Sequence, residues 1–424
     1  MNSKYRFGTE ENREFQREIR EELLRFGHRF PSPEGGSYWL GDDGTPWRTR
    51  NRETWITGRM VHVYSIGAML GHEGSQELAD QGLRGLAGEL RDDQYDGWYA
   101  GVSAEGEPYG PKQCYAHAFV ILAACSALLA GRPGAKELLE HAMEVYDRYF
   151  WEDETGLSVD AWNMKFTELD SYRGLNANMH TVEAFLAAAD AVGEETYRKR
   201  AGRIIDHVIG WAENNEWRIP EHYTRNWKAD LEYHGNQKDD PFKPYGATPG
   251  HGIEWARLIT QWSVSVYGEP GEEKKTAEKQ GKERDVYLDA AEHLFHRAVL
   301  DAWDTDGARG IVYTTDWTGK PVVHDRMHWT LAEGINTAAV LHRVTGKPIY
   351  SDYYSWFMQY LDEAVMDHEN GSWYHQLDQN NQVIATVWPG KADLYHALQS
   401  TLIPYLPVGV SIARAVHDEQ KSAN

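Results

Sequence analysis

The stretch YDGWYA, residues 95–100, is the first of four short segments that together predict the architecture of this chain. Each segment combines an acidic turn and a glycine with aromatic or apolar residues. The other three are EDETGLSVDAW (152–162), DTDGARGIVYTTDW (304–317) and ENGSWYHQL (369–377). The glycines at 97 and 156 are 59 positions apart, and those at 307 and 371 are 64 apart. This spacing predicts a degenerate repeat of about 60 to 70 residues, in which each helical hairpin ends in a small β turn.

The long segments between these turns have apolar residues at helical spacing. Some are more apolar and rich in small residues, such as 114–131 and 332–346, and we expect these to be buried on more than one side. The remaining segments have a single apolar face, so outer and inner helices should alternate. These amphipathic segments are residues 10–30, 75–91, 135–150, 181–192, 197–215, 286–303 and 351–368.

About six such hairpins would fill the 424 residues. Closed into a ring, they predict an all-α protein, an (α/α)6 barrel with short β-hairpins at one rim and a pocket that opens at one end. Although length alone would also fit two or three domains, the repeat predicts a single domain over residues 1–424. The charged run at 268–284 has little apolar content and is predicted to be an exposed connection between helices.

Charge and composition limit the possible partners. The 43 basic and 65 acidic residues give a formal charge of −22, which argues against nucleic acid or an anionic membrane. No apolar run approaches the roughly 18 residues that cross a bilayer. The first residues contain no apolar signal segment, and Cys114 and Cys125 are too few for a disulfide framework. We therefore expect a cytoplasmic protein without nucleic-acid or membrane partners, and a homo-oligomer remains open.

The aromatic content points to a carbohydrate ligand. The 17 Trp and 24 Tyr exceed what a core of this size needs, and their flat apolar faces suit the C–H side of sugar rings. Most of these side chains must nevertheless pack between helices.

The stretch YGATPGHGIEWARL, residues 245–258, predicts a helix that begins with a histidine in its first turn. Thr248 can cap free backbone N–H groups, and Pro249 has no N–H to leave unpaired. His251 and Glu254 then lie three residues apart on one face, where the carboxylate can orient or charge the imidazole. A capped surface helix would show the same pattern. The pair therefore indicates a functional site only if similar polar groups occur elsewhere in the chain.

Four further places put histidine and polar partners where a core would want apolar groups. In the first, Trp55, Arg59 and His62 lie on one face of an apolar helix, and a buried guanidinium there needs a partner or a ligand. Because each place is near the start of a predicted inner helix, we expect all five to converge on one pocket. The others are Tyr115 with His117, Asn176 and Asn178 with His180 and Glu183, His328 with Glu333, and Trp388 and Asp393 with His396.

Each place also has a structural interpretation. His62 fits a satisfied core histidine better than a chemical role, and His117 fits either. HxxE pairs can bind metals, but no third carboxylate-rich helix completes a cluster, so neither a metal nor a cofactor is predicted. The chain has no phosphate-loop, dinucleotide or GxSxG motif. The chemistry predicted from the residues is histidine acid/base catalysis in an aromatic pocket.

Six motifs in this order resemble the N-acylglucosamine 2-epimerase superfamily, and more closely its aldose–ketose isomerase branch. The resemblance spans nearly the full chain and implies an (α/α)6 barrel that moves a proton on a monosaccharide without metal or cofactor. The motifs are WITGRMVHVYS (55–65), DGWYA (96–100), NANMHTVEAFL (176–186), TPGHGIEWARL (248–258), GIVYTTDWTGKPV (310–322) and KADLYH (391–396).

The resemblance also implies roles for these residues. His396 would carry the proton between C2 and C1 through a cis-enediol, while His251, helped by Glu254, would assist ring opening and handle hydroxyl protons. A fixed cation, Arg59, would stabilise the charge that develops on the substrate oxygen. The remaining residues expected to bind the sugar are Trp55, Tyr115, Asn176, His180, Glu183, Trp317, Glu333 and Trp388.

The substrate implied by the resemblance is D-mannose, interconverted with D-fructose, and D-lyxose and D-xylulose share the relevant stereochemistry. Ala392 and His375 stand where sulfosugar members are expected to carry glutamines, which disfavours sulfoquinovose. A sugar 2-epimerase acting on an aldose or N-acyl sugar remains the main alternative. An (α/α)6 glycoside hydrolase would need acidic residues as its main catalysts, and a non-catalytic sugar-binding protein would not need two HxxE pairs.

Overall fold

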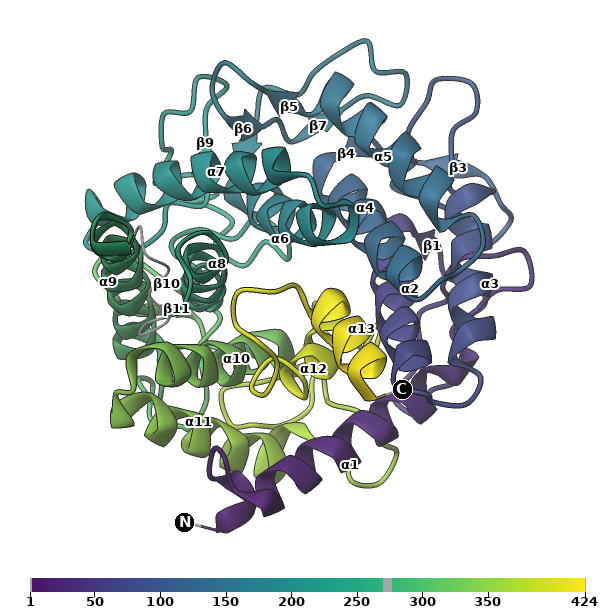
Figure 1. The fold of residues 1–424 in the computed structure, drawn as a ribbon. Coiled ribbons are helices and arrows are strands. Elements are labelled where there is room, and N and C mark those ends of the chain that lie inside the picture. Colours follow the sequence, from purple (N-terminus) through teal and green to yellow (C-terminus); the bar gives the residue numbers. More distant parts are fainter. Residues whose placement is uncertain (1, 270–276, 424) are drawn as a thin grey trace.

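The computed structural model describes residues 2–269 and 277–423, and in these ranges the helices form two concentric rings (Figure 1). The inner ring consists of α2 (Thr54–Met69), α4 (Cys114–Leu129), α6 (Leu175–Val192), α8 (Pro249–Tyr267), α10 (His328–Thr345) and α12 (Tyr395–Ser400). The outer ring consists of α3 (Ser75–Ala87), α5 (Ala135–Tyr149), α7 (Glu195–Glu213), α9 (Ala277–Ala302), α11 (Pro348–Tyr360) and α1 (Glu10–Phe26). The predicted (α/α)6 barrel is confirmed.

The two rings differ in sequence as their burial requires. On α4, every residue from Ala116 to Ala127 is buried, so this helix is apolar on all sides. On its outer partner α5, the buried residues recur at helical spacing and leave the opposite face polar, as Leu138, Ala142 and Tyr146 show. Inner helices are therefore enclosed by neighbours, whereas outer helices cover them with a single face.

The sixth pair of helices differs from the predicted repeat. Five hairpins are consecutive in sequence, but the short inner helix α12 has α1, from the other end of the chain, as its outer neighbour. Helix α12 also packs against α2 and α10, which closes the ring. A closed ring needs each inner helix covered, and here the two ends of the chain share that task.

The charged run also differs in part from its prediction. Residues 270–276 lie outside the described residues, but the run continues into α9, which begins at Ala277. The end of the run is therefore helical.

Short antiparallel strands hold the starts of the inner helices at one rim. β1, β4, β8 and β12 each end directly before an inner helix, and they pair with β2, β7, β9 and β13 from later loops. This pairing fixes where these four inner helices begin. The strands are β1 (Arg52–Glu53), β2 (Gly101–Val102), β3 (Pro108–Tyr109), β4 (Lys112–Gln113), β5 (Trp151–Glu152), β6 (Leu157–Ser158), β7 (Ala161–Trp162), β8 (Arg173–Gly174), β9 (His222–Tyr223), β10 (Thr314–Thr315), β11 (Pro321–Val323), β12 (Arg326–Met327) and β13 (Gln376–Leu377).

The turn at YDGWYA shows why its glycine is needed. Gly97 has a φ of 70°, and a Cβ there would lie 2.7 Å from Nε2 of His117. The same nitrogen accepts a hydrogen bond from the backbone N–H of Trp98 at 3.1 Å, while Nδ1 of His117 bonds the carbonyl of Gln113. His117 is thus a structural residue that ties the turn to α4.

Buried lysines lock two of these turns. Nζ of Lys112 donates to Asp92 Oδ2 at 2.7 Å and to the carbonyl of Asp96 at 2.8 Å, and both charged side chains are almost completely buried. Lys391 repeats the arrangement with Asp367, at 2.6 Å. In both turns the lysine Nζ bonds a buried carboxylate and a backbone carbonyl of the turn at the same time.

We expect Lys112→Met to lower the free energy of unfolding by about 3–5 kcal/mol, because Asp92 would remain buried without its cation. Urea denaturation followed by circular dichroism measures this. The control is Lys136→Met, which removes an exposed ion pair with Glu140 and should change stability by less than about 1 kcal/mol. Equal losses in the two variants would contradict the structural role given to Lys112.

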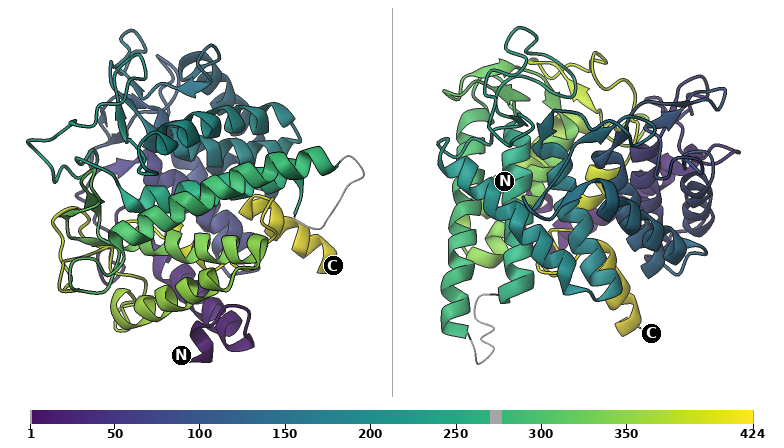
Figure 2. Two further views of the ribbon diagram at one scale, coloured as in Figure 1. Left: turned by 90° about the vertical axis from the view of Figure 1, so that its left-hand side faces the viewer. Right: turned by 90° about the horizontal axis from the view of Figure 1, so that it is seen from above.

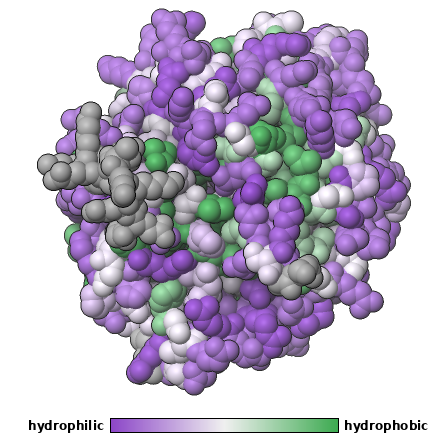
Figure 3. Space-filling model, viewed as in Figure 1, coloured by the Kyte–Doolittle hydropathy of each residue, from purple (hydrophilic) through white to green (hydrophobic). Residues whose placement is uncertain are grey.

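The end of the barrel opposite the strands is covered by α13 (Ile412–Ala423), which packs against α2, α4 and α6. Figure 2 shows the strands and α13 at opposite ends of the barrel, and Figure 3 shows apolar surface gathered near the middle of the α13 end. No helix in the described part of the chain has the length and apolar character of a bilayer-spanning segment.

Candidate active site

The inner helices bring a cluster of charged and aromatic side chains together just below the strand-bearing rim. Arg59, on the second turn of α2, donates from Nη1 to Asp393 Oδ2 at 3.1 Å and from Nη2 to the Tyr115 hydroxyl at 2.9 Å. Its guanidinium lies 4.8 Å from the ring centre of Trp55 and is 4.7 Å from that of Tyr395. Nε of Arg59 is buried without a hydrogen-bond partner among the described residues. The guanidinium is therefore fixed in place and retains an unused donor.

His396 is held by a carboxylate from a different helix. Its Nδ1 lies 3.0 Å from Oε1 of Glu333 on α10, and because that carboxylate can only accept, Nδ1 carries the hydrogen. Burial, together with nearby Arg59, lowers the pKa of His396 well below its ordinary value. His396 is thus neutral near pH 7, with a free lone pair on Nε2. A neutral imidazole with this tautomer can act as a general base.

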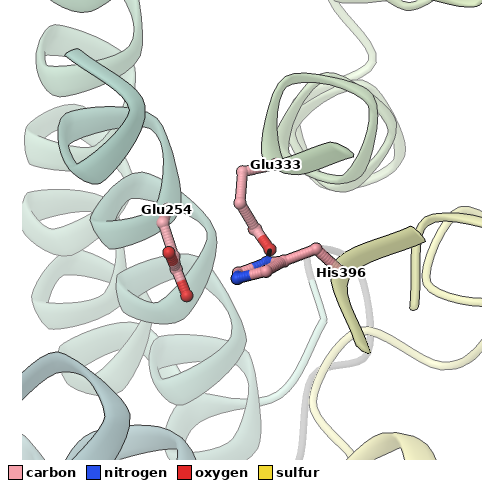
Figure 4. A group of neighbouring side chains, drawn as sticks. All are labelled: Glu254, Glu333 and His396. Carbon is pink, nitrogen blue, oxygen red and sulfur yellow. Dashed lines mark hydrogen bonds and ion pairs between the residues drawn. The ribbon is translucent and has the colours of Figure 1, made fainter. Parts of the chain in front are cut away.

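Two buried carboxyl groups and one arginine surround this imidazole. Glu254, Glu333 and His396 point toward one another from α8, α10 and α12 (Figure 4), and their ligand atoms lie within 4.8 Å of one another. Arg257 donates from Nε to Glu333 Oε2 at 2.7 Å and from Nη2 to Glu254 Oε1 at 3.4 Å. Burial and the neighbouring Glu333 raise the pKa of Glu254 well above its ordinary value. Burial also raises the pKa of Glu333, against the opposing effect of the Arg257 guanidinium, so Glu254 is the carboxyl that takes up a proton more readily.

This trio also has the composition of a metal site, since imidazole and carboxylate are common ligands. Arg257, however, already places a positive charge on both carboxylates. The prediction that the site holds no metal remains to be tested with a chelator.

His251 begins α8 as predicted, but its carboxylate partner is different. Nδ1 of His251 lies 3.0 Å from Oε2 of Glu221, whereas Glu254 turns toward His396. The prediction that Glu254 orients His251 is therefore wrong, because side chains three apart on a helix diverge when stronger partners lie on either side. Pro249 is at the helix start, yet no side-chain cap forms from Thr248, which corrects that prediction.

The predicted pair His180–Glu183 is present on α6. Nδ1 of His180 lies 3.5 Å from Oε2 of Glu183, and burial lowers the pKa of His180 to about 4. Glu183 also accepts from the Tyr395 hydroxyl and, at 3.1 Å, from Gln399. The His180 ring lies 6.5 Å from that of His396, so it belongs to the same cluster.

Asn176, one turn before His180, has a buried Oδ1 without a hydrogen-bond partner among the described residues. An unpaired buried amide oxygen is uncommon and fits a group that accepts from a ligand hydroxyl. Asn178, by contrast, is fully used by the backbone of Ser158 and Gly174.

Tryptophans line one side of the cluster. Trp388 stacks on Trp39 with ring centres 6.2 Å apart and meets Trp55 edge-on at 5.9 Å. Trp317 behaves differently, because its Nε1 donates to the backbone carbonyl of Leu231 at 2.7 Å and none of its described contacts involves the cluster. The structure thus gives Trp317 a loop-bracing contact rather than a place beside the histidines.

Two of the predicted histidines have structural contacts, although Arg59 and Tyr115 from the same places belong to the cluster. His62 is buried against Ser126, with Nδ1 2.7 Å from its Oγ, as expected for a core histidine, and its ring centre lies 5.8 Å from that of Tyr395 at the edge of the cluster. His117 serves the turn at Gly97. His328 does lie at the cluster, stacked on His375 with ring centres 3.8 Å apart and 6.4 Å from His396.

Sequence reasoning missed Glu221, Arg257, Tyr395 and Trp329 as members of the cluster. Arg257 had a signal, since it lies three residues after Glu254 on the same helix face. Trp329 lies between the two key histidines, 5.1 Å from the His251 ring and 5.9 Å from that of His396. Glu221 had no signal in the sequence around His251, because it comes from the loop that follows a neighbouring hairpin.

The (α/α)6 barrel and its buried cluster of histidines and carboxylates have the architecture of an enzyme active site. The model of the N-acylglucosamine 2-epimerase (GlcNAc 2-epimerase) family matches residues 35–400. The chain belongs to this family.

Related proteins agree with this assignment. A D-mannose isomerase of Thermobifida fusca is 41% identical over 397 residues, which cover 93% of this chain and 94% of the relative. The crystal structure of a D-mannose isomerase superposes with a TM-score of 0.82 at 27% identity, covering 92% of this chain and 97% of the other. A cellobiose 2-epimerase from Spirochaeta thermophila has a TM-score of 0.77 at 18% identity, over 93% of this chain and 98% of that one, and shows the shared fold alone.

Proposed function

We propose that this protein is an aldose–ketose isomerase that interconverts D-mannose and D-fructose by histidine acid/base catalysis. The observation that carries the proposal is the neutral, fully oriented imidazole of His396, whose Nδ1 is bonded to Glu333 and whose Nε2 is free. The high identity to D-mannose isomerases over nearly the whole chain supports the choice of sugar. D-Lyxose and D-xylulose share the geometry at C1 and C2 and are expected as secondary substrates.

In the proposed reaction, Nε2 of His396 removes the proton from C2 of the open-chain aldose. The electrons of that C–H bond form the C1–C2 double bond, and the carbonyl electrons move onto O1, which takes a proton from the protonated imidazole of His251. The neutral His251 imidazole then removes the proton from O2 of the cis-enediol. As O2 becomes the carbonyl oxygen, the C1–C2 double-bond electrons take the proton held by His396, which forms the new C1–H bond. Arg59 lies where a fixed cation can stabilise the charge on the substrate oxygens.

We assign ring opening to His251. Its Nδ1 is bonded to Glu221, so its other nitrogen can exchange a proton with the ring oxygen while the carboxylate stabilises the imidazolium. Tyr115, His180 and Asn176 are then left to bind hydroxyl groups. Glu333 acts on His396 rather than on the sugar, since it is completely buried.

We expect Glu221→Gln to lower kcat/KM for mannose about tenfold, because the amide no longer stabilises a protonated His251. Initial rates of fructose formation measure this. Glu216→Gln is the matched control: this residue belongs to the same loop, its side chain is 77% exposed, and the described ion pair of that side chain is with Arg218. An unchanged rate in Glu221→Gln would remove His251 from the mechanism.

Three alternative activities would each require a different arrangement of the same residues. A 2-epimerase must deliver a proton to the opposite face of C2, which would require His251 as well as His396 at that carbon. A sulfosugar isomerase must bind a sulfonate, but the two guanidiniums of the cluster already pair with Asp393 and with Glu333. A glycoside hydrolase needs two carboxyl groups on either side of a sugar bond, whereas Arg257 here bridges Glu254 and Glu333 directly.

The test of the proposal uses purified protein with excess chelator and separate incubations with mannose, sulfoquinovose, N-acetylglucosamine and a mannoside. Fructose formed from mannose is the expected product, detected by chromatography. Glucose without ketose would establish an epimerase instead, and activity on sulfoquinovose alone would overturn the choice of sugar. Loss of activity with chelator would refute the metal-free mechanism. Cytoplasmic localisation and a homo-oligomer remain predictions.

A further inference from the structure

Arg257 lies at the centre of the buried charges beneath His396. It is 1% exposed and uses all three guanidinium nitrogens: Nε on Glu333, Nη2 on Glu254 and Nη1 on Gln261 at 3.0 Å. The first of these bonds is the shortest, at 2.7 Å. A buried arginine bonded to a carboxylate that itself bonds a histidine can control that histidine from a distance.

We propose that Arg257 is a positioning residue that keeps Glu333 ionised, and thereby keeps the hydrogen of His396 on Nδ1 and the lone pair on Nε2. This inference rests on the proposed function of His396 and names the residue that prepares it. Without the guanidinium, two buried carboxyl groups would face each other with no cation, and Glu333 would take up a proton. A protonated Glu333 would donate to Nδ1, which would put the hydrogen of His396 on Nε2, where the proton from C2 must arrive.

The surroundings support this assignment. The other charged or titratable groups that face the trio are Arg59 and Asp393, which pair with each other, His328, the pair His180–Glu183, and the hydroxyls of Tyr115 and Tyr395. Because Arg59 and Asp393 largely cancel, Arg257 is the cation that balances Glu333. The structure therefore gives the ionisation of Glu333 a single main support.

A cavity approaches Arg257 from the end of the barrel opposite the rim. It has a volume of about 40 Å³, room for roughly two or three water molecules. Arg257, Gln261 and Glu183 form its inner wall, and Val410 and Ser411, just before α13, lie at its outer side. Arg198 lines the same cavity but pairs with Asp190 and Glu195. Arg257 thus lines a small cavity on the side of the barrel opposite the rim.

The first experiment compares Arg257→Met, Arg257→Gln and Arg257→Lys in pH profiles of kcat/KM for mannose. Removing the positive charge should raise the pH at which activity is half lost on the acid side by at least about one unit and reduce the rate near pH 7 by about 10- to 100-fold. Lysine keeps the charge, so its acid limb should stay near that of the unmodified protein. Arg198→Met, the control that lines the same cavity, should match the unmodified protein.

A uniform loss at every pH, with the acid limb in place, would make Arg257 merely structural and would overturn the proposal. So would a lysine variant that shifts as far as the neutral ones. Arg257→Gln retains an amide that can donate to Glu333, which gives a second neutral variant if Arg257→Met does not fold.

The second experiment is chemical rescue of Arg257→Ala by guanidinium ion, for which removal of the side chain adds space to the adjoining cavity. Rescue should saturate and should be non-competitive with mannose, because this cavity lies toward the end of the barrel opposite the rim. Absence of rescue, with equal concentrations of potassium chloride as the salt control, would count against the cavity route and against a role for the charge itself.

A third readout does not depend on turnover. Nitrogen-15 NMR of imidazole groups reports the tautomer of His396, identified by its absence in His396→Asn. The unmodified protein should show hydrogen on Nδ1, and Arg257→Met should lose that signature. If mannose is not converted but the tautomer changes, the proposed function fails while the inference about Arg257 stands; an unchanged tautomer overturns the inference alone.

Discussion

Replacing His396 with asparagine is expected to reduce kcat for mannose by about 10³-fold, with little change in KM. The asparagine amide can occupy the position of Nδ1 and still donate to Glu333, so the buried carboxylate keeps its partner. Only Nε2 is removed, and with it the group that takes the proton from C2. Steady-state kinetics with mannose measure both constants.

The matched control is His62→Asn, which also replaces a buried imidazole of the inner ring with an amide. His62 bonds Ser126 and takes no part in the proposed chemistry. This variant should lose some stability in thermal unfolding but keep kcat within about twofold when corrected for folded protein. Comparable activity losses in both variants would mean that His396 acts through packing rather than as a base.

Arg59→Met is expected to have the second largest effect, a fall in kcat of about 10²- to 10³-fold. The guanidinium is fixed by Asp393 and Tyr115 and retains a free Nε, so it needs no rearrangement when charge develops on the substrate oxygens. Arg59→Lys keeps the charge without the planar donors and should recover part of the rate.

The change at Arg59 also leaves Asp393 buried without its cation, at a cost of about 3–5 kcal/mol in the free energy of unfolding. The double variant Arg59→Met/Asp393→Asn removes this cost and should regain stability without regaining activity. A double variant as active as the unmodified protein would show that Arg59 serves only to neutralise Asp393.

Much of the fold could be predicted because helical periodicity and turn glycines repeat along the chain. The inner helix over 114–131 and the outer helix over 135–150 match α4 and α5 closely. The closing hairpin could not be predicted, because α12 has only six residues and its partner α1 lies at the other end of the sequence. Spacing within one repeat contains no signal for that pairing.

The site was predictable where its residues lie at the starts of inner helices. Arg59, Tyr115 and His180 meet because the rim strands align their helices, and His396 joins them from α12, which packs against α2 and α10. The carboxylate of His251 was assigned to the wrong residue, because Glu221 reaches it from the strand β9 region 30 positions away in sequence. Partners from different hairpins are invisible to local spacing, whereas Arg257 was visible and overlooked.

In the proposed reaction His396 transfers one proton between C2 and C1, and proton NMR of mannose in D2O with chelator follows that transfer. We predict that fructose appears with deuterium at C1, or with the C2 hydrogen retained there when transfer is faster than exchange, and that His396→Asn abolishes both signals. Fructose formed at an undiminished rate by His396→Asn, or glucose formed without any ketose, would contradict the account.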